Sequence, residues 1–337
     1  MLEEPSPPST SPKGSLTLLD AQGRPRALIN ASTLTGFRTA LASTLLLKAR
    51  DSVHTTTCFG AGVQAFWHLY LALLLRGPEI HHLNIVNRSF DHARDLAQAL
   101  GGCLNPTVSA AFRSEKLRTE LLTPSFGEYN RLLKEYVRAA DVIFMTTPST
   151  EPLFPASFLT SPGAHTKGRY IAAIGSYKPH MREIPVEVIH QAVRGPHKHH
   201  GIHHKYAESS AIVVDTIEGA FKEAGEIIES GISGDSIVEI GEIVMLIKNS
   251  RDREEVLSRW LDTEERDGGR KVQKKSSSRN SSRDRESGGS TKGLTDWMER
   301  GNVIYKSVGL GLMDVVVGME IVKLAEERGV GTTIHDF

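Results

Sequence analysis

The chain has 337 residues, and 40 Lys and Arg residues balance 40 Asp and Glu residues, so its formal net charge is zero. This length supports one large or two modest domains with buried cores, and the charge balance excludes a strongly basic binder of nucleic acid or of a charged membrane surface. The two cysteines, Cys58 and Cys103, argue against a disulfide framework, and the start MLEEPSPPSTSPKG is unlike a signal or transit peptide, so we expect a cytoplasmic protein.

The N-terminal part of the chain predicts a hairpin followed by a helix. Residues 1–14 are rich in proline and serine and carry little to bury, so we expect them to be disordered. Two β-like runs, 15–19 and 26–29, flank a turn-rich segment and predict the hairpin. Residues 31–48 predict the helix, with Ser32 or Thr33 as its N-cap and an apolar face made by Leu34, Phe37, Leu41 and Leu45.

Arg38 borders this apolar face. An arginine in such a position is usually a snorkelling or salt-bridged surface residue. The alternative is a clamp for the carboxylate of a substrate, because a guanidinium binds a carboxylate through two parallel hydrogen bonds.

Residues 56–88 carry the pattern around which the fold is predicted. An apolar strand ends in the turn Gly60-Ala61-Gly62, and a helix too short to span a bilayer and a second strand follow. This order is typical of the first unit of a dinucleotide-binding fold. Gly60 would allow the tight turn, and Gly62 would let the backbone approach a pyrophosphate at the N-terminus of the helix. An ordinary strand-to-helix turn is the alternative for a lone G-x-G-x-x-A pattern.

The end of the second strand indicates which cofactor is bound. NAD-binding proteins usually place an acidic residue there for the ribose 2′-hydroxyl, whereas this chain has Asn87, Arg88 and Ser89. An arginine suits the 2′-phosphate of NADP, so we expect NADP(H), with NAD(H) as the alternative. If Arg88 only caps a surface turn, this expectation fails.

The following residues predict alternating helices and strands, and hence an α/β fold with a doubly wound parallel sheet. Ligands of such sheets lie beyond the carboxyl ends of the strands. Thr146, Thr147 and Pro148 follow one of these strands and are therefore expected to touch the cofactor. The predicted strands are 141–145, 169–174 and 211–215, the last being the final clear strand, and the predicted helices are 89–100, 126–140, 217–230 and 303–326.

Two further segments have unusual compositions, but the sequence does not favour a functional site in either of them. Five histidines lie between residues 197 and 204, but no carboxylate or cysteine stands at zinc-site spacing, so we expect a solvated loop and no metal. Residues 263–292 are rich in serine and charged residues and predict a disordered insertion.

Six segments occur along the chain in a recognisable order: LTGFRTALAS (34–43), CFGAGVQA (58–65), DVIFMTTPSTEPLF (141–154), IAAIGSYKPHMRE (171–183), VVDTIEGAFKEAG (213–225) and KSVGLGLMD (306–314). With them the chain resembles the ornithine cyclodeaminase/μ-crystallin family. The G-A-G-x-Q-A turn and the K-S-x-G segment are fairly specific together. The resemblance runs from about residue 15 to the C-terminus, apart from the predicted insertion.

This resemblance implies a Rossmann domain for NAD(P), over residues 51–235. It also implies a smaller α+β domain for substrate binding and dimerisation, formed by residues 15–50 and 236–337, and a homodimer. The family's chemistry is hydride transfer at the carbon that carries the amino or imino nitrogen of a small amino or imino acid. When the family's motifs are matched residue by residue to this chain, the carboxylate-binding arginine is Arg38. The matching cofactor-binding positions are Gly60, Gly62, Val63, Gln64, Thr147, Ser307 and Val308.

The chain departs from the family at three places. The aspartate that assists deamination in the cyclodeaminases is replaced by Tyr177, which disfavours cyclodeamination. Many reductase-like relatives have P-D-M-R-E where this chain has a histidine, His180, which either donates a proton to an imine nitrogen or is a surface replacement. Family members also have several dozen residues before the hairpin, so we expect either a shortened gene model or a truncated substrate domain.

The sequence therefore predicts an NAD(P)H-dependent reductase of a cyclic imino acid, of the type that converts pyrroline-2-carboxylate to proline. Arg38 and His180 are the candidate catalytic residues. Two alternatives stay open: an ornithine cyclodeaminase, and a non-catalytic NADPH-binding protein comparable to the crystallin role in the family.

Overall fold

The computed structural model describes residues 14–164, 167–193, 211–246, 248 and 294–334. The predictions for residues 1–13, for the histidines between residues 197 and 204, and for the insertion over 263–292 lie outside the described residues. Among the described helices, none is both long and apolar enough to cross a membrane.

A parallel eight-stranded sheet forms the centre of the molecule, with the strand order β5-β4-β3-β6-β7-β10-β8-β9. Most of its strands are buried and predominantly apolar, as expected when helices cover both faces of a parallel sheet. The predicted α/β class with a doubly wound sheet is confirmed. The strands are β3 (Thr55–Phe59), β4 (His82–Val86), β5 (Arg118–Leu122), β6 (Val142–Met145), β7 (Tyr170–Ala173), β8 (Ala211–Val214), β9 (Ile237–Glu239) and β10 (Val303–Lys306).

Helices pack on both faces of the sheet and create two apolar cores. One core contains side chains of α1 (Ala31–Lys48), α2 (Val63–Arg76), α3 (Phe90–Gly101) and α4 (Pro106–Phe112), and of the helical residues 240–246 and 294–300. The other contains side chains of α5 (Tyr129–Ala139), α6 (Ser157–Thr160), α7 (Val186–Val193), α8 (Ile217–Glu223) and α9 (Gly225–Ser230). Two short 3₁₀ turns, η1 (Gly77–Glu79) and η3 (Gly234–Ser236), are also present.

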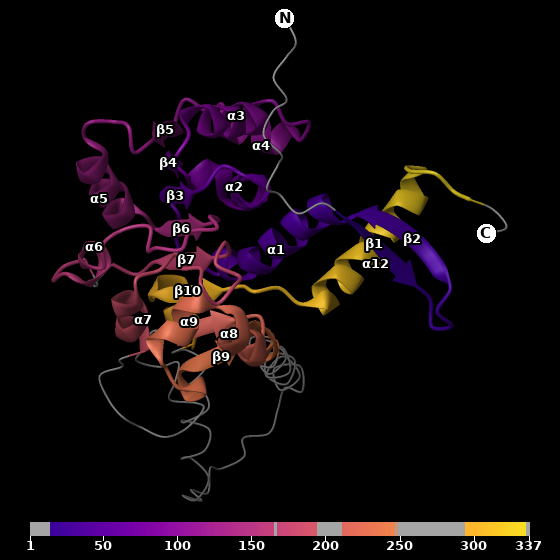
Figure 1. Cartoon of the computed structure of the whole chain (residues 1–337). Helices are drawn as coiled ribbons and strands as arrows, with labels where there is room; N and C mark the ends of the chain where they lie inside the picture. The colour runs from indigo at the N-terminus through magenta and orange to yellow at the C-terminus, as the bar shows by residue number, and fades with distance from the viewer. Residues whose placement is uncertain (1–13, 165–166, 194–210, 247, 249–293, 335–337) are drawn as a thin grey trace, which may run out of the picture.

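An arm projects from the sheet and is built from both ends of the chain (Figure 1). It contains the antiparallel hairpin of β1 (Ser15–Leu19) and β2 (Pro25–Asn30), which confirms the predicted hairpin, and the long helix α12 (Gly311–Arg328). Gly318 lies where α12 meets the hairpin, because a Cβ added there would stand 3.4 Å from side-chain atoms of Leu16, Leu18 and Ile29. Helix α1 connects the arm to the sheet and packs against α2.

The largest difference from the sequence-based expectation concerns residues 303–326. We predicted one helix, but Val303–Lys306 forms β10 and the helix begins at Gly311. The periodicity of a buried run of only three apolar or aromatic residues and a lysine does not distinguish a strand from a helix, so the prediction failed there. Strand 211–215 is consequently not the last, because β9 and β10 follow it, and both come from the segment assigned to the second domain.

Smaller differences concern the ends and faces of helices. The N-cap of α1 is Asn30, whose side chain accepts a hydrogen bond from the backbone N–H of Thr33. Leu41 and Leu45 are exposed, because α1 buries the face that packs against α2 instead. The predicted helix over 217–230 is divided into α8 and α9 at Ala224, and the helix expected from residue 126 begins at Tyr129.

Candidate functional site

The glycine turn lies at the carboxyl edge of the sheet, between β3 and β6. The strand order reverses between these two strands, which is where open α/β sheets bind ligands. Gly60 has a φ of +104°, and a Cβ there would lie 2.6 Å from Oγ1 of Thr146. The same Thr146 hydroxyl donates a hydrogen bond to the carbonyl of Phe59 at 2.7 Å. The close approach of the two loops therefore requires a glycine at position 60.

The N-terminus of α2 is open, as the predicted pyrophosphate site requires. A Cβ on Gly62, its N-cap residue, would meet no atom within 4 Å in the described part of the protein, and no side chain caps the helix there. The first-turn N–H groups of a helix lack intrahelical partners, and the helix dipole attracts anions to them. Ala61 packs partly against the core, Val63 is exposed, and Oε1 of Gln64 is buried with no hydrogen-bond partner among the described residues.

The three residues after β4 form a short polar turn. Nδ2 of Asn87 donates to the carbonyl of Ser89 at 2.9 Å, and Oγ of Ser89 caps α3 by accepting from the N–H of His92. Arg88 between them is exposed, and its side chain makes no hydrogen bond or ion pair within the described part of the chain. It is accessible to an anionic ligand at this edge.

The loop after β6 is held by a buried glutamate, Glu183. The backbone N–H and the hydroxyl of Thr147 donate to its Oε1 at 2.6 and 3.0 Å, and the N–H groups of Gly175 and Ser176 donate to its Oε2 at 2.7 and 3.2 Å. Burial raises the pKa of Glu183 to about 7, although Lys306 and the Thr147 hydrogen bonds act in the opposite direction. Pro148, next in the loop, is exposed. Glu183 thus joins the ends of β6 and β7.

A buried lysine, Lys306, lies beside this glutamate at the end of β10. Its Nζ donates to Oγ of Ser176 at 2.7 Å and to the carbonyl of Ala173 at 3.3 Å, and it lies 3.4 Å from Oε1 of Glu226. Lys306, Glu183 and Glu226 are each 0% exposed. No local sequence pattern indicates a role for these three residues, apart from the position of Lys306 directly after an apolar run.

The loop after β10 is fixed by Asp215 at the end of β8. Its Oδ2 accepts hydrogen bonds from Oγ of Ser307 at 3.0 Å and from the N–H groups of Val308 and Gly309 at 3.0 and 2.6 Å. These three hydrogen bonds anchor the loop to the end of the neighbouring strand. Ser307 and Val308 lie at the same edge of the sheet as the glycine turn, as the family resemblance implies.

Arg38 lies between this loop and the arm. Its Nε donates to Oδ1 of Asp314 at 3.0 Å, and its side chain is only 10% exposed. Helix α1 also contacts the glycine turn, since Nε2 of Gln64 donates to the carbonyl of Thr35 at 3.4 Å and a Cβ on Gly36 would stand 2.6 Å from Cγ1 of Val63. The structure thus brings Arg38 near the predicted cofactor-binding turn.

His180 is not brought into this group. Its side chain is exposed, and no hydrogen bond in the described part of the structure joins it to Arg38 or to Thr147. Within the described residues, no group of three or more His, Cys, Asp or Glu side chains is placed to hold a metal ion.

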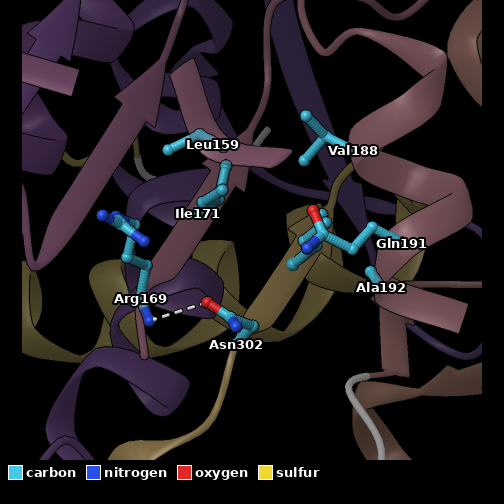
Figure 2. A pocket seen from close by; sticks show the side chains of 8 residues that line it. Leu159, Arg169, Ile171, Val188, Gln191, Ala192 and Asn302 are labelled. Atoms are coloured by element: carbon cyan, nitrogen blue, oxygen red, sulfur yellow. Dashed lines mark hydrogen bonds between the residues drawn. The ribbon is translucent and has the colours of Figure 1, made fainter. Parts of the chain in front are cut away.

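A pocket on the protein lies at the opposite edge of the sheet (Figure 2). It is lined by Arg169 and Asn302, which directly precede β7 and β10, and by residues of α7 including Val188 and Gln191. The backbone N–H of Arg169 donates to Oδ1 of Asn302 at 3.2 Å. This pocket is at the amino edge and is not part of the candidate site.

Comparison with curated proteins finds several relatives, although no protein-family model matches the chain. An uncharacterized protein of Saccharomyces cerevisiae is 29% identical over 238 residues, which cover 63% of this chain and 58% of that protein. A Delta(1)-pyrroline-2-carboxylate reductase of Bacillus cereus is 25% identical over 330 residues, covering 96% of this chain and 74% of the relative. The ketimine reductase mu-crystallin of Macropus fuliginosus is 27% identical over 248 residues, covering 72% of this chain and 63% of its own length.

Solved structures share the fold. The Thermococcus litoralis Delta(1)-pyrroline-2-carboxylate reductase, in complex with NADH and L-proline, gives a TM-score of 0.62 at 20% identity, covering 96% of this chain and 74% of that one. A probable ornithine cyclodeaminase from Bordetella pertussis gives 0.58 at 21% identity, covering 95% and 76%. Together with the sequence relatives, these matches confirm the predicted resemblance of the chain to the ornithine cyclodeaminase/μ-crystallin family.

Proposed function

We propose that this protein is an NADP(H)-dependent reductase of a cyclic imino acid, of the pyrroline-2-carboxylate type. One observation carries the proposal: the open N-terminus of α2 at the strand-order reversal contacts the segment of α1 that bears Arg38. An anion site for a dinucleotide and a guanidinium for a carboxylate thus lie on two helices in contact. The reductase and ketimine reductase names of the relatives support this reading.

The residues at the carboxyl edge fit a dinucleotide. The turn Gly60–Gly62 and the first-turn N–H groups at Val63 and Gln64 would hold the pyrophosphate, because the site is open at Gly62 and no side chain of the described residues caps the helix. Arg88, exposed beside Asn87 and Ser89, would hold the 2′-phosphate of NADP. The loops at Thr146–Pro148 and Ser307–Val308 would lie beside the nicotinamide.

The bound cofactor supplies a hydride, and the protein residues orient its acceptor. Arg38 would bind the carboxylate of the imino acid and so fix the position of the neighbouring C=N carbon. Because the guanidinium is mostly buried and already fixed by Asp314, little conformational freedom is lost when the substrate binds.

NADPH oxidation by the purified protein tests the proposal, with pyrroline-2-carboxylate and piperideine-2-carboxylate as substrates. We expect Arg38→Lys to lower kcat/KM about 100-fold, because a lysine does not reproduce the planar fork of hydrogen bonds. Arg26→Lys, an exposed position on the same arm, serves as the control and should leave kcat/KM unchanged. If NADPH is oxidised with neither of the two substrates, the proposal is contradicted.

Assays on the same purified protein distinguish the reductase from the two alternative functions. Release of proline and ammonia from ornithine would identify a cyclodeaminase. NADPH binding without turnover of any of these compounds would identify a non-catalytic NADPH-binding protein. His180→Gln tests the candidate proton donor: a lower kcat supports that role, and an unchanged kcat assigns His180 to the surface.

We also propose that the protein forms a homodimer through α12. Leu312, Val316 and Met319 of this helix are 68%, 52% and 60% exposed, and Gly318 is its one buried residue. Contiguous exposed apolar side chains of this kind mark protein interfaces. Light scattering should give the mass of a dimer, and Met319→Glu should give the mass of a monomer.

A further inference from the structure

The loop that follows β7 lies between the two loops that are proposed to flank the nicotinamide. In the sheet, β7 stands between β6 and β10, and the three strands are parallel, so the loops at their carboxyl ends are neighbours at one edge. A Cβ added to Gly175 would collide with the backbone of Thr147, in the loop after β6. Oγ of Ser176 accepts a hydrogen bond at 2.7 Å from Nζ of Lys306, the last residue of β10. Gly175 and Ser176 are therefore fixed between the two loops, and Tyr177 follows them directly.

The side chains of Ser176 and Tyr177 have opposite environments. Ser176 is 0% exposed, and its hydroxyl donates to Oε1 of Glu226 at 2.6 Å. Tyr177 is 41% exposed, and its hydroxyl has no hydrogen-bond partner within the described part of the chain. Nζ of Lys178 lies 5.7 Å from the centroid of the Tyr177 ring. The carboxyl edge thus presents an accessible phenol with a cation beside it.

Reduction of a cyclic imine requires two transfers, a hydride to the carbon and a proton to the nitrogen. The cofactor supplies only the hydride. Arg38 does not release a proton, because a guanidinium stays protonated in proteins. The hydroxyl of Thr147 donates to Glu183, and Glu183 and Lys306 are fully buried and held by hydrogen bonds. The exposed phenol of Tyr177 carries a proton that no such contact holds.

His180 stands further along the same loop, where the backbone packs against a helix instead. A Cβ on Gly225, the first residue of α9, would stand 2.7 Å from the carbonyl oxygen of Pro179 and would collide with that of Met181. The residues on both sides of His180 therefore contact α9, whereas Tyr177 directly follows the residues that contact the loop after β6. This placement favours Tyr177 over His180 as the proton donor.

We infer that Tyr177 is a catalytic residue, which donates its phenolic proton to the imine nitrogen while the hydride adds to the neighbouring carbon. The inference rests on the proposed function. The hydride brings the electron pair of the new C–H bond, and the π pair of the C=N bond takes the proton as the O–H bond of the phenol breaks. The resulting tyrosinate carries a negative charge that the ammonium of Lys178 stabilises, and it regains a proton from water.

The test compares two substrates with Tyr177→Phe, a variant that keeps the ring beside Lys178 but lacks the hydroxyl. Pyrroline-2-carboxylate needs a proton on its nitrogen. Its N-methyl iminium derivative needs none, because the hydride alone converts it to N-methylproline. We expect kcat for pyrroline-2-carboxylate to fall about 100-fold, and kcat for the iminium to stay within about twofold of wild type.

Two further measurements control for effects on folding and binding. Tyr70→Phe removes the same hydroxyl from a partly buried position in the middle of α2 and should change neither kcat. Pyrrole-2-carboxylate, a planar ring with a carboxylate and no C=N bond to reduce, reports on binding alone. Its Kd for the NADPH-loaded protein, measured by calorimetry, should stay within about threefold of wild type in Tyr177→Phe.

The outcomes are distinct. An unchanged kcat for pyrroline-2-carboxylate, an equal loss with both substrates, or a Kd for pyrrole-2-carboxylate raised by the same factor would each overturn the inference. A selective loss in His180→Gln but not in Tyr177→Phe would overturn it as well. If wild type reduces neither substrate, the proposed function fails and the inference with it, a result that is visible before any substitution is made.

Discussion

Both hydrogen-bond donors of Thr147, its backbone N–H and its hydroxyl, converge on Oε1 of Glu183, at 2.6 and 3.0 Å. The two residues stand on different loops, and Glu183 is fully buried between them. Gly175 completes the contact, since a Cβ there would collide with the Thr147 backbone. The shape of the loop beside the predicted nicotinamide site is thus determined by a side chain that the cofactor need not touch.

Glu183→Gln should destabilise the protein and weaken cofactor binding. The amide group replaces one acceptor oxygen with a donor, which faces N–H donors in a buried site. We expect a loss of about 3 kcal/mol in the free energy of unfolding, measured with urea at pH 4.5, where the contribution of Glu183 is still present. Glu115→Gln, at an exposed position, is the control and should stay within about 0.5 kcal/mol of wild type. Equal stability of the two variants would contradict this account.

The pH dependence of stability should also report on Glu183. Burial raises its pKa from 4.5 to about 7, so between these values the folded protein holds a proton that the unfolded chain releases. Its contribution to stability is present below pH 4.5 and is lost as the pH rises to about 7, by up to about 3 kcal/mol. The difference in unfolding free energy between wild type and Glu183→Gln should therefore decrease over this range. If the difference in unfolding free energy instead grows with pH, the pKa of Glu183 is lowered in the folded protein.

The two glycines of the turn should respond differently to alanine. Gly60→Ala should destabilise the protein without any ligand, because a positive φ and the contact with Thr146 both exclude a Cβ. Gly62→Ala should fold normally, since its Cβ meets open space, but should raise the Kd for NADPH where the backbone approaches the pyrophosphate. Thermal unfolding and NADPH fluorescence titration measure the two effects. Equal NADPH affinity in Gly62→Ala and wild type would place the pyrophosphate elsewhere.

Arg88→Ser should change the preference for NADP over NAD. Loss of a charge-assisted hydrogen bond to the 2′-phosphate costs about 1.5–3 kcal/mol, so the Kd for NADPH should rise about 10–100-fold, while that for NADH stays constant. Arg113→Ser removes a different exposed arginine and controls for net charge. If both cofactors lose affinity equally, Arg88 does not read the 2′-phosphate.

Local sequence patterns predicted most of the sheet but not its contacts over long separations. The turn at Gly60 and Gly62 can be predicted from the sequence because the residues that form it are close together in the chain. The pair Arg38–Asp314 joins positions 276 residues apart, and no local pattern indicates it. Lys306 was predicted to lie at the start of a helix because the three buried residues before it have no periodicity that identifies a strand.

β10 is synthesised last among the described strands, yet it lies between β7 and β8. Until residues 303–306 leave the ribosome, β7 and β8 each keep one edge of N–H and C=O groups without the partner that they have in the native sheet. Nascent chains that expose such edges are prone to aggregate. A chain that stops before Val303 would lack the strand that joins β7 to β8 in the native sheet.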